Sequence, residues 1–149
     1  MITFKLILCP IDFSNTSYHA LDTAIELATK LEARIKLVHI YQYPVYSMPE
    51  ADLPTPVNLT IQDDYEKRLQ EQLEKVCVKY SNDHLSLESE IVEGVPYIEI
   101  VHAAKKINAD LIVMGTHGRT GLSHMLMGSV AERVVRSSTI PVMSVPDKS

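Results

Sequence analysis

Short apolar runs alternate with amphipathic segments along the chain, and this alternation restricts the fold more than any other feature. A strand buried on both faces reads as a continuous apolar run, whereas a helix that covers a sheet repeats its apolar residues every three or four positions. Strand–helix–strand units of this kind join parallel strands through right-handed crossovers. We therefore expect an α/β fold with a five-stranded, mostly parallel sheet and helices on both faces.

The expected elements follow one another in a simple order. The strand-like runs are Phe4–Cys9, Arg34–Tyr41, Leu85–Val92, Asp110–Met114 and Ile140–Val145. The first helix carries an apolar stripe at Leu21, Ala24, Ile25, Ala28 and Leu31. The later helices run from Ile61 to about Tyr80, from Pro96 to about Lys106 and from about Gly128 to Arg136. Ser14 is expected to be an N-cap, and Pro96 suits a first helical position because it has no N–H.

One segment, Tyr43–Asn58, shows no clear periodicity. It contains four of the eight prolines of the chain. A long connection inside a compact domain is typical of a lid, a binding loop or a surface excursion. The sequence leaves these alternatives open.

Composition excludes several classes of function. A chain of 149 residues fits a single domain spanning positions 1–149. The net charge of −5 argues against nucleic acid as the main partner, because binding to phosphate backbones needs a basic surface. No apolar run approaches the length of about 20 residues that a membrane helix needs. The first residues lack the pattern of a signal peptide.

Cys9 and Cys77 fit no zinc spacing, so we expect buried thiols in a reducing cytoplasm.

Two sequence features fall at the ends of expected strands. Cys9-Pro-Ile-Asp12 ends the first strand, and a stretch from Met114 through Gly121 to Ser129 follows the fourth. In open parallel sheets, ligands bind beyond the carboxyl ends of the strands, where the strand order reverses. If these two strands are neighbours, both segments border one crevice.

The second segment has the composition of a phosphate-binding loop. Glycines allow a backbone to approach a ligand closely, and Gly128-Ser129 opens a helix whose N–H groups and dipole favour an anion. His117 and Arg119 add further donors. The alternative is a loop that only turns the chain, but the Gly-Ser pair at a helix start favours phosphate binding. The glycines of the loop itself are Gly115, Gly118 and Gly121.

Neither standard nucleotide fingerprint is present. The chain contains no G-x-x-x-x-G-K-[ST] motif, and no G-x-G-x-x-G follows the first strand. The sequence therefore indicates neither a P-loop NTPase nor a dinucleotide-dependent dehydrogenase.

The spacing G-x2-G-x9-G-[ST] is satisfied by Gly115, Gly118, Gly128 and Ser129. With this spacing, the chain resembles the universal stress protein family, specifically its ATP-binding subgroup. The resemblance extends over nearly the whole sequence. It rests further on the segments ILCPIDFS, LVHI, GVP, DLIVMGTHGRTG and GSVAERVVRSSTIPVMSV.

The resemblance implies a Rossmann-like fold with strand order 3-2-1-4-5 and a homodimer formed through the last strand, Ile140–Val145. It also implies that the chain binds ATP, with adenine and ribose beside Pro10 and Asp12 and the base packed on Ile40. A divalent cation, Mg²⁺ or Mn²⁺, would be held mainly by phosphate oxygens. The implied ATP-binding residues are Pro10, Ile11, Asp12, Ile40, Met114, Gly115, His117, Gly118, Arg119, Gly128, Ser129 and Val130.

Three functions are compatible with these residues. The first is an ATP-binding regulatory module of the stress response, and the second is a slow ATPase in which His117 is the candidate base. The third is a dimeric scaffold without nucleotide, which the intact Gly/Ser pattern disfavours. We favour the first function, in which His117 donates a hydrogen bond from the loop to phosphate. In this function we expect no catalytic residue and no metal ligand from the protein. His39 is expected to be a hydrogen-bonded core histidine. The sequence does not distinguish ATP from ADP or AMP.

Overall fold

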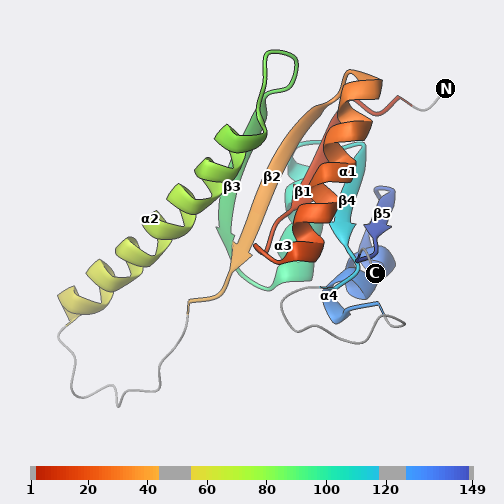
Figure 1. Ribbon diagram of the computed structural model, residues 1–149. Coiled ribbons are helices and arrows are strands. Elements are labelled where there is room, and N and C mark those ends of the chain that lie inside the picture. Colours follow the sequence, from red (N-terminus) through yellow and green to blue (C-terminus); the bar gives the residue numbers. More distant parts are fainter. Residues whose placement is uncertain (1–2, 44–54, 118–126, 148–149) are drawn as a thin grey trace.

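The computed structural model describes residues 3–43, 55–117 and 127–147, and for residues 55–60 it describes the backbone alone. Figure 1 shows how the helices and strands are arranged. The strands are β1 (Leu6–Pro10), β2 (Arg34–Tyr41), β3 (Leu87–Glu93), β4 (Leu111–Gly115) and β5 (Val142–Val145). The helices are α1 (Asn15–Leu31), α2 (Thr55–Tyr80), α3 (Pro96–Lys106) and α4 (Ser129–Ser137).

The strands form one parallel sheet in the order β3-β2-β1-β4-β5. This confirms the fold class and the strand order expected from the sequence. β1 lies at the centre, where Ile7, Leu8 and Cys9 are fully buried. Its neighbours β2 and β4 belong to opposite halves of the chain, so the direction of winding reverses at β1. That reversal opens a crevice beyond the carboxyl end of β1.

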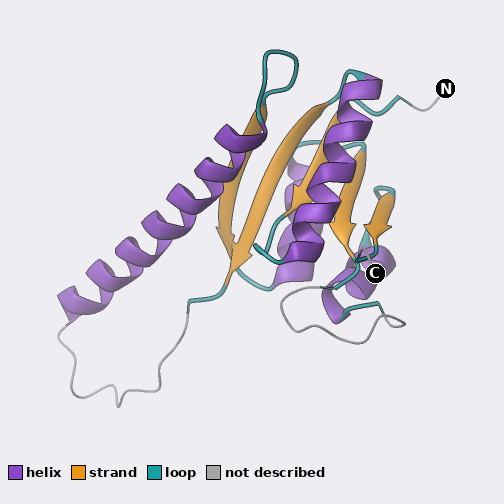
Figure 2. Cartoon of the chain, viewed as in Figure 1, coloured by secondary structure: helices purple, strands orange, loops and turns teal. Residues whose placement is uncertain are grey.

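Helices cover both faces of the sheet, as Figure 2 shows. One core cluster joins α1 and α2 to alternate strand residues such as Ile7, Cys9 and Leu37. The second cluster joins α3 and α4 to the residues between them, such as Leu8 and Val38. Successive strand residues point to opposite faces, so each central strand contributes to both clusters. Among the described residues, no helix combines the length and the apolar character needed to cross a bilayer.

Helix α2 begins at Thr55, six residues before the expected start at Ile61. The expected irregular segment Tyr43–Asn58 was therefore too long at its end, and residues 44–54 lie outside the described part of the chain. Pro56 is the second residue of α2, where its missing N–H removes no helical hydrogen bond. The prolines and the weak apolar pattern masked this first turn in the sequence.

The turn between β1 and α1 has a defined local structure. Ser14 is the N-cap of α1, as expected, and its side-chain oxygen accepts a hydrogen bond from the Ser17 amide at 3.2 Å. Phe13 has a φ of 64°. This left-handed conformation is rare for a bulky side chain and persists only where surrounding contacts hold it.

Both cysteines are buried free thiols, so the structure agrees with the sequence on their packing. Burial raises the pKa of the Cys9 thiol to about 12. The thiolate is the reactive form of cysteine, and this group therefore stays a neutral thiol near pH 7.

Asp110 connects the amino-terminal ends of β4 and β1. Its Oδ2 accepts hydrogen bonds from the amides of Lys5 and Leu6 at 2.8 and 2.9 Å. We predict that Asp110→Ala lowers the free energy of unfolding by about 1–3 kcal/mol, because the half-buried Leu6 amide loses its acceptor. Denaturant unfolding measures this change. Glu71→Ala, at an exposed position of α2, is the control and should stay within about 0.5 kcal/mol of the parent. Equal losses in the two variants would contradict this role of Asp110.

Candidate functional site

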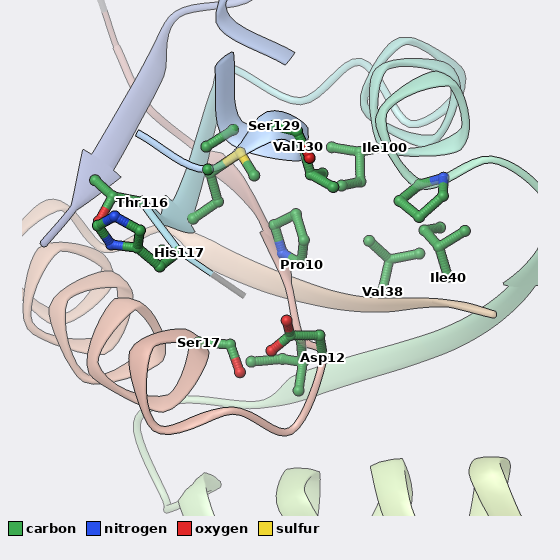
Figure 3. A pocket seen from close by; sticks show the side chains of 16 residues that line it. Pro10, Asp12, Ser17, Val38, Ile40, Ile100, Thr116, His117, Ser129 and Val130 are labelled. Carbon is green, nitrogen blue, oxygen red and sulfur yellow. The ribbon is translucent and has the colours of Figure 1, made fainter. Parts of the chain in front are cut away.

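A cavity of about 230 Å³ lies at the carboxyl ends of β1, β2 and β4, between the sheet and the starts of α1, α3 and α4. Figure 3 shows the side chains that line it. This is the crevice that the strand order predicts. The lining residues are Pro10, Ile11, Asp12, Ser17, Val38, Ile40, Pro96, Ile100, Met114, Gly115, Thr116, His117, Gly128, Ser129, Val130 and Ala131.

The two ends of the cavity differ in chemistry (Figure 3). Val38 and Ile40 of β2 and Ile100 of α3 form one end, which is apolar. Thr116 and His117, which follow β4, lie at the other end. A cavity with an apolar wall and a few convergent polar groups is the usual form of a small-molecule site. Here the polarity changes along its length, so it suits a ligand with one apolar end and one polar or charged end.

Asp12 is held at the cavity by the cap of α1. Its Oδ1 accepts hydrogen bonds from the Ser14 amide at 2.9 Å and from the Ser14 hydroxyl. The same hydroxyl oxygen accepts from the Ser17 amide, so one short network fixes both the helix start and the carboxylate. An ionised carboxylate only accepts hydrogen bonds, which makes Asp12 a suitable partner for hydroxyl groups of a ligand.

The first turn of α4 borders the cavity with its backbone. Gly128 is the N-cap and makes no side-chain cap. The next residues, Ser129, Val130 and Ala131, all line the cavity. The first amides of a helix have no partner within that helix, and together with the helix dipole they favour an anion. This part of the cavity is therefore suited to phosphate.

Thr116 joins three parts of the site. Its carbonyl oxygen accepts from the Gly128 amide at 2.6 Å, which brings the two ends of segment 117–127 together. Its amide donates to the Val145 carbonyl of β5 at 3.0 Å. Its hydroxyl lies 3.0 Å from Nδ1 of His117, and either group can be the donor. The position of His117 and the start of α4 thus depend on the same residue.

Ten of the twelve residues named from the sequence surround this cavity. The other two, Gly118 and Arg119, lie outside the described residues. Sequence reasoning missed six lining residues: Ser17, Val38, Pro96, Ile100, Thr116 and Ala131. Val38 could have been found, because it lies two residues before Ile40 and shares its face of β2. Ile100 could also have been found, because it lies one helical turn after Pro96.

The described residues contain no group of three or more His, Cys, Asp or Glu side chains that could hold a metal ion.

The universal stress protein family model matches residues 3–146. The chain belongs to the universal stress protein family. Its relatives include universal stress protein MJ0531 of Methanocaldococcus jannaschii, 38% identical over 143 residues, which cover 95% of this chain and 82% of the relative.

Two solved structures illustrate the likeness of this universal stress protein to known folds. Hypothetical protein MJ0577 of M. jannaschii superposes with a TM-score of 0.82 and 28% identity over 99% of each chain. A universal stress protein from Archaeoglobus fulgidus, solved in complex with dAMP, has a TM-score of 0.65 and 20% identity. That match covers 97% of this chain and 99% of the other, and at this identity it shows the shared fold alone.

Gly128 in this universal stress protein lies too close to Thr116 for any side chain. A Cβ at position 128 would lie 2.8 Å from the Thr116 carbonyl oxygen, which belongs to the backbone and cannot rotate away. We predict that Gly128→Ala weakens the hydrogen bond between these residues and costs about 1–3 kcal/mol of stability. Thermal unfolding and hydrogen exchange at the position-128 amide measure the two effects. Ser129→Ala, at the exposed next position, should leave both nearly unchanged. Parent-like exchange in Gly128→Ala would contradict the close contact.

Proposed function

We propose that this universal stress protein binds ATP in the cavity and acts as a nucleotide-responsive regulatory module of the stress response. The observation that carries the proposal is the change from apolar to polar lining along the cavity. Its polar part includes the start of α4, where no side chain caps the first amides. Adenosine triphosphate has the same sequence of parts: a flat base, a sugar with hydroxyl groups and a charged phosphate chain. The complex of a family member with dAMP adds support from a protein of the same fold.

The base is assigned to the apolar end. Val38 and Ile40 come from β2, and Pro96 and Ile100 come from α3, so two elements face each other across this end. Aliphatic side chains on opposite sides suit a flat aromatic ring, because contact with both of its faces removes apolar surface from water. Pro10 and Ile11 at the end of β1 also line the cavity and are assigned to the side of the base. Met114 at the end of β4 is assigned to the path of the ribose and phosphates.

The ribose is assigned to Asp12, because its carboxylate accepts hydrogen bonds and its direction is fixed by Ser14. A sugar hydroxyl can donate to an acceptor that is already oriented, which lowers the loss of side-chain entropy on binding.

The phosphates are assigned to the first turn of α4. The amides of Ser129 and Val130 and the Ser129 hydroxyl are donors, and Gly115 and His117 border the path towards them. Gly118 and Arg119 belong to this part of the proposal on the sequence motif alone. We assign Mg²⁺ or Mn²⁺ to the phosphates, because small divalent cations prefer oxygen ligands and are commonly bound through the phosphates of a substrate.

We favour binding without efficient turnover. Phosphoryl transfer needs a residue that orients the attacking water and strong stabilisation of the transferring group. Slow ATP hydrolysis is the second candidate, and the observation that favours it is the place of His117 in the cavity wall. In the first function His117 acts as a donor to phosphate, and in the second it acts as a base.

The first test identifies the molecule that the purified protein carries. We expect protein prepared without added nucleotide to release ATP on denaturation, as measured by chromatography and mass spectrometry. Asp12→Ala should release much less, because the ribose loses its acceptor. Asp22→Ala, which borders a different groove on α1, is the matched control and should release as much as the parent.

The outcomes of this test separate the candidate functions. Released ADP or AMP would favour the ATPase, and His117→Ala should then stop phosphate release while binding persists. A parent protein that carries no nucleotide and shows no heat of ATP binding in calorimetry would overturn the proposal and leave the scaffold.

We further propose that two copies pair through β5 as a homodimer. The two edge strands of the sheet differ in charge: β3 carries Glu88, Glu90 and Glu93, whereas β5 has the uncharged sequence Val-Met-Ser-Val. Charged residues protect an edge strand from pairing with another chain, and an uncharged apolar edge favours pairing. The Met143 side chain, 37% exposed, adds apolar surface at this edge.

Met143→Lys should convert the dimer into a monomer, because it places a charge at the paired edge. Size-exclusion chromatography with light scattering gives the mass of each species. Val78→Lys is the control, since Val78 is 80% exposed on α2, which packs mainly against β3 at the opposite edge of the sheet from β5. A parent protein with the mass of one chain would overturn the dimer.

A further inference from the structure

His39 is a buried polar side chain that the proposed binding site does not use. It lies on β2 and is 5% exposed. Val38 and Ile40, its neighbours in the strand, line the cavity. Because successive strand residues point to opposite faces, the His39 ring lies on the other face of the sheet, towards α1. The ring therefore lies behind the site.

The ring is bonded to the backbone at the end of β1. Nδ1 of His39 lies 2.7 Å from the carbonyl oxygen of Ile11. A carbonyl oxygen only accepts hydrogen bonds, so Nδ1 carries a proton and donates it. The Ile11 amide in turn donates to the Val38 carbonyl at 2.8 Å. Both polar backbone groups of Ile11 thus bond to β2: its amide donates to the Val38 carbonyl, and its carbonyl accepts from the His39 imidazole.

The same ring contacts Phe13, with ring centroids 4.7 Å apart at an angle of 43°. Phe13 is the residue with a φ of 64°, a conformation that a bulky residue keeps only when other contacts stabilise it. His39 therefore binds the residue before Asp12 and packs on the residue after it. Asp12 is the residue whose carboxylate reaches the cavity.

We infer that His39 is a positioning residue for Asp12. Its Nδ1–H and its ring hold Ile11 and Phe13, and these hold the backbone from which the Asp12 carboxylate enters the site. Ser14 fixes the same carboxylate from its other side. The inference rests on the proposed function, since the effect of His39 is read through the affinity for ATP. His39 acts on the ligand through Asp12.

The test is a double-mutant cycle read by calorimetry of ATP binding. His39→Phe keeps a ring against Phe13 and removes the Nδ1–H donor. We expect it to weaken ATP binding about tenfold, because this change in affinity corresponds to the free energy of about one hydrogen bond. In the Asp12→Ala background, His39→Phe should lower the affinity for ATP by less than about twofold, because the carboxylate that His39 positions is absent. His39→Asn places an amide nitrogen near the position of Nδ1 and should stay within about threefold of the parent.

His39→Gln places its amide farther from the Ile11 carbonyl and should resemble His39→Phe, and it carries the test if His39→Phe fails to fold. Thermal unfolding identifies the folded variants. Parent-like affinity of His39→Phe, or an equal loss in both backgrounds, would overturn the inference while leaving ATP binding intact. A parent that binds no ATP would instead overturn the proposed function, and the inference with it.

Discussion

The burial of β1 at the centre of the sheet is the constraint on which the rest of the structure depends. Ile7 and Cys9 belong to the core cluster on one face and Leu8 belongs to the cluster on the other, and all three are fully buried. A central strand must pair on both sides, so β2 and β4 take up its two edges. Because the chain then winds in opposite directions from β1, no crossover covers its carboxyl end. The cavity is a consequence of this topology.

The residues that leave β1 connect the core to the site. Pro10 ends the strand, and the chain then turns through Phe13 into the Ser14 cap of α1. Only residues 11–14 lie between β1, whose middle residues are fully buried, and α1, and Ser14 bonds the Asp12 carboxylate, so that group has little freedom. The His39 ring and the Ser14 hydroxyl fix this turn from two sides. Stability of the central sheet and geometry of the site therefore depend on the same short segment.

Much of the fold could be predicted from the sequence, because continuous apolar runs and helical periodicity are local signals. The strand Arg34–Tyr41 was expected with the observed bounds, and the Ser14 cap was recognised from its residue type. The start of α2 was missed, since its first turn contains Pro56 and lacks an apolar stripe. Lining residues such as Val38 and Ile100 were not identified, because sequence periodicity shows that a face is buried and does not show which part of that face borders a cavity.

By itself the sequence determined the alternation of strands and helices, the glycine and serine positions of the motif and, through its resemblance, the family. Each of these is a property of residue order. The tertiary structure decided that Asp12, Ile40 and Ser129 border one cavity, because they come from three elements that meet only after the sheet has formed. It also decided the role of His39. In the sequence this residue is a histidine between apolar neighbours, and only the fold places the Ile11 carbonyl and the Phe13 ring against it. Hydrogen bonds between distant segments depend on packing, and packing has no local signature in the sequence.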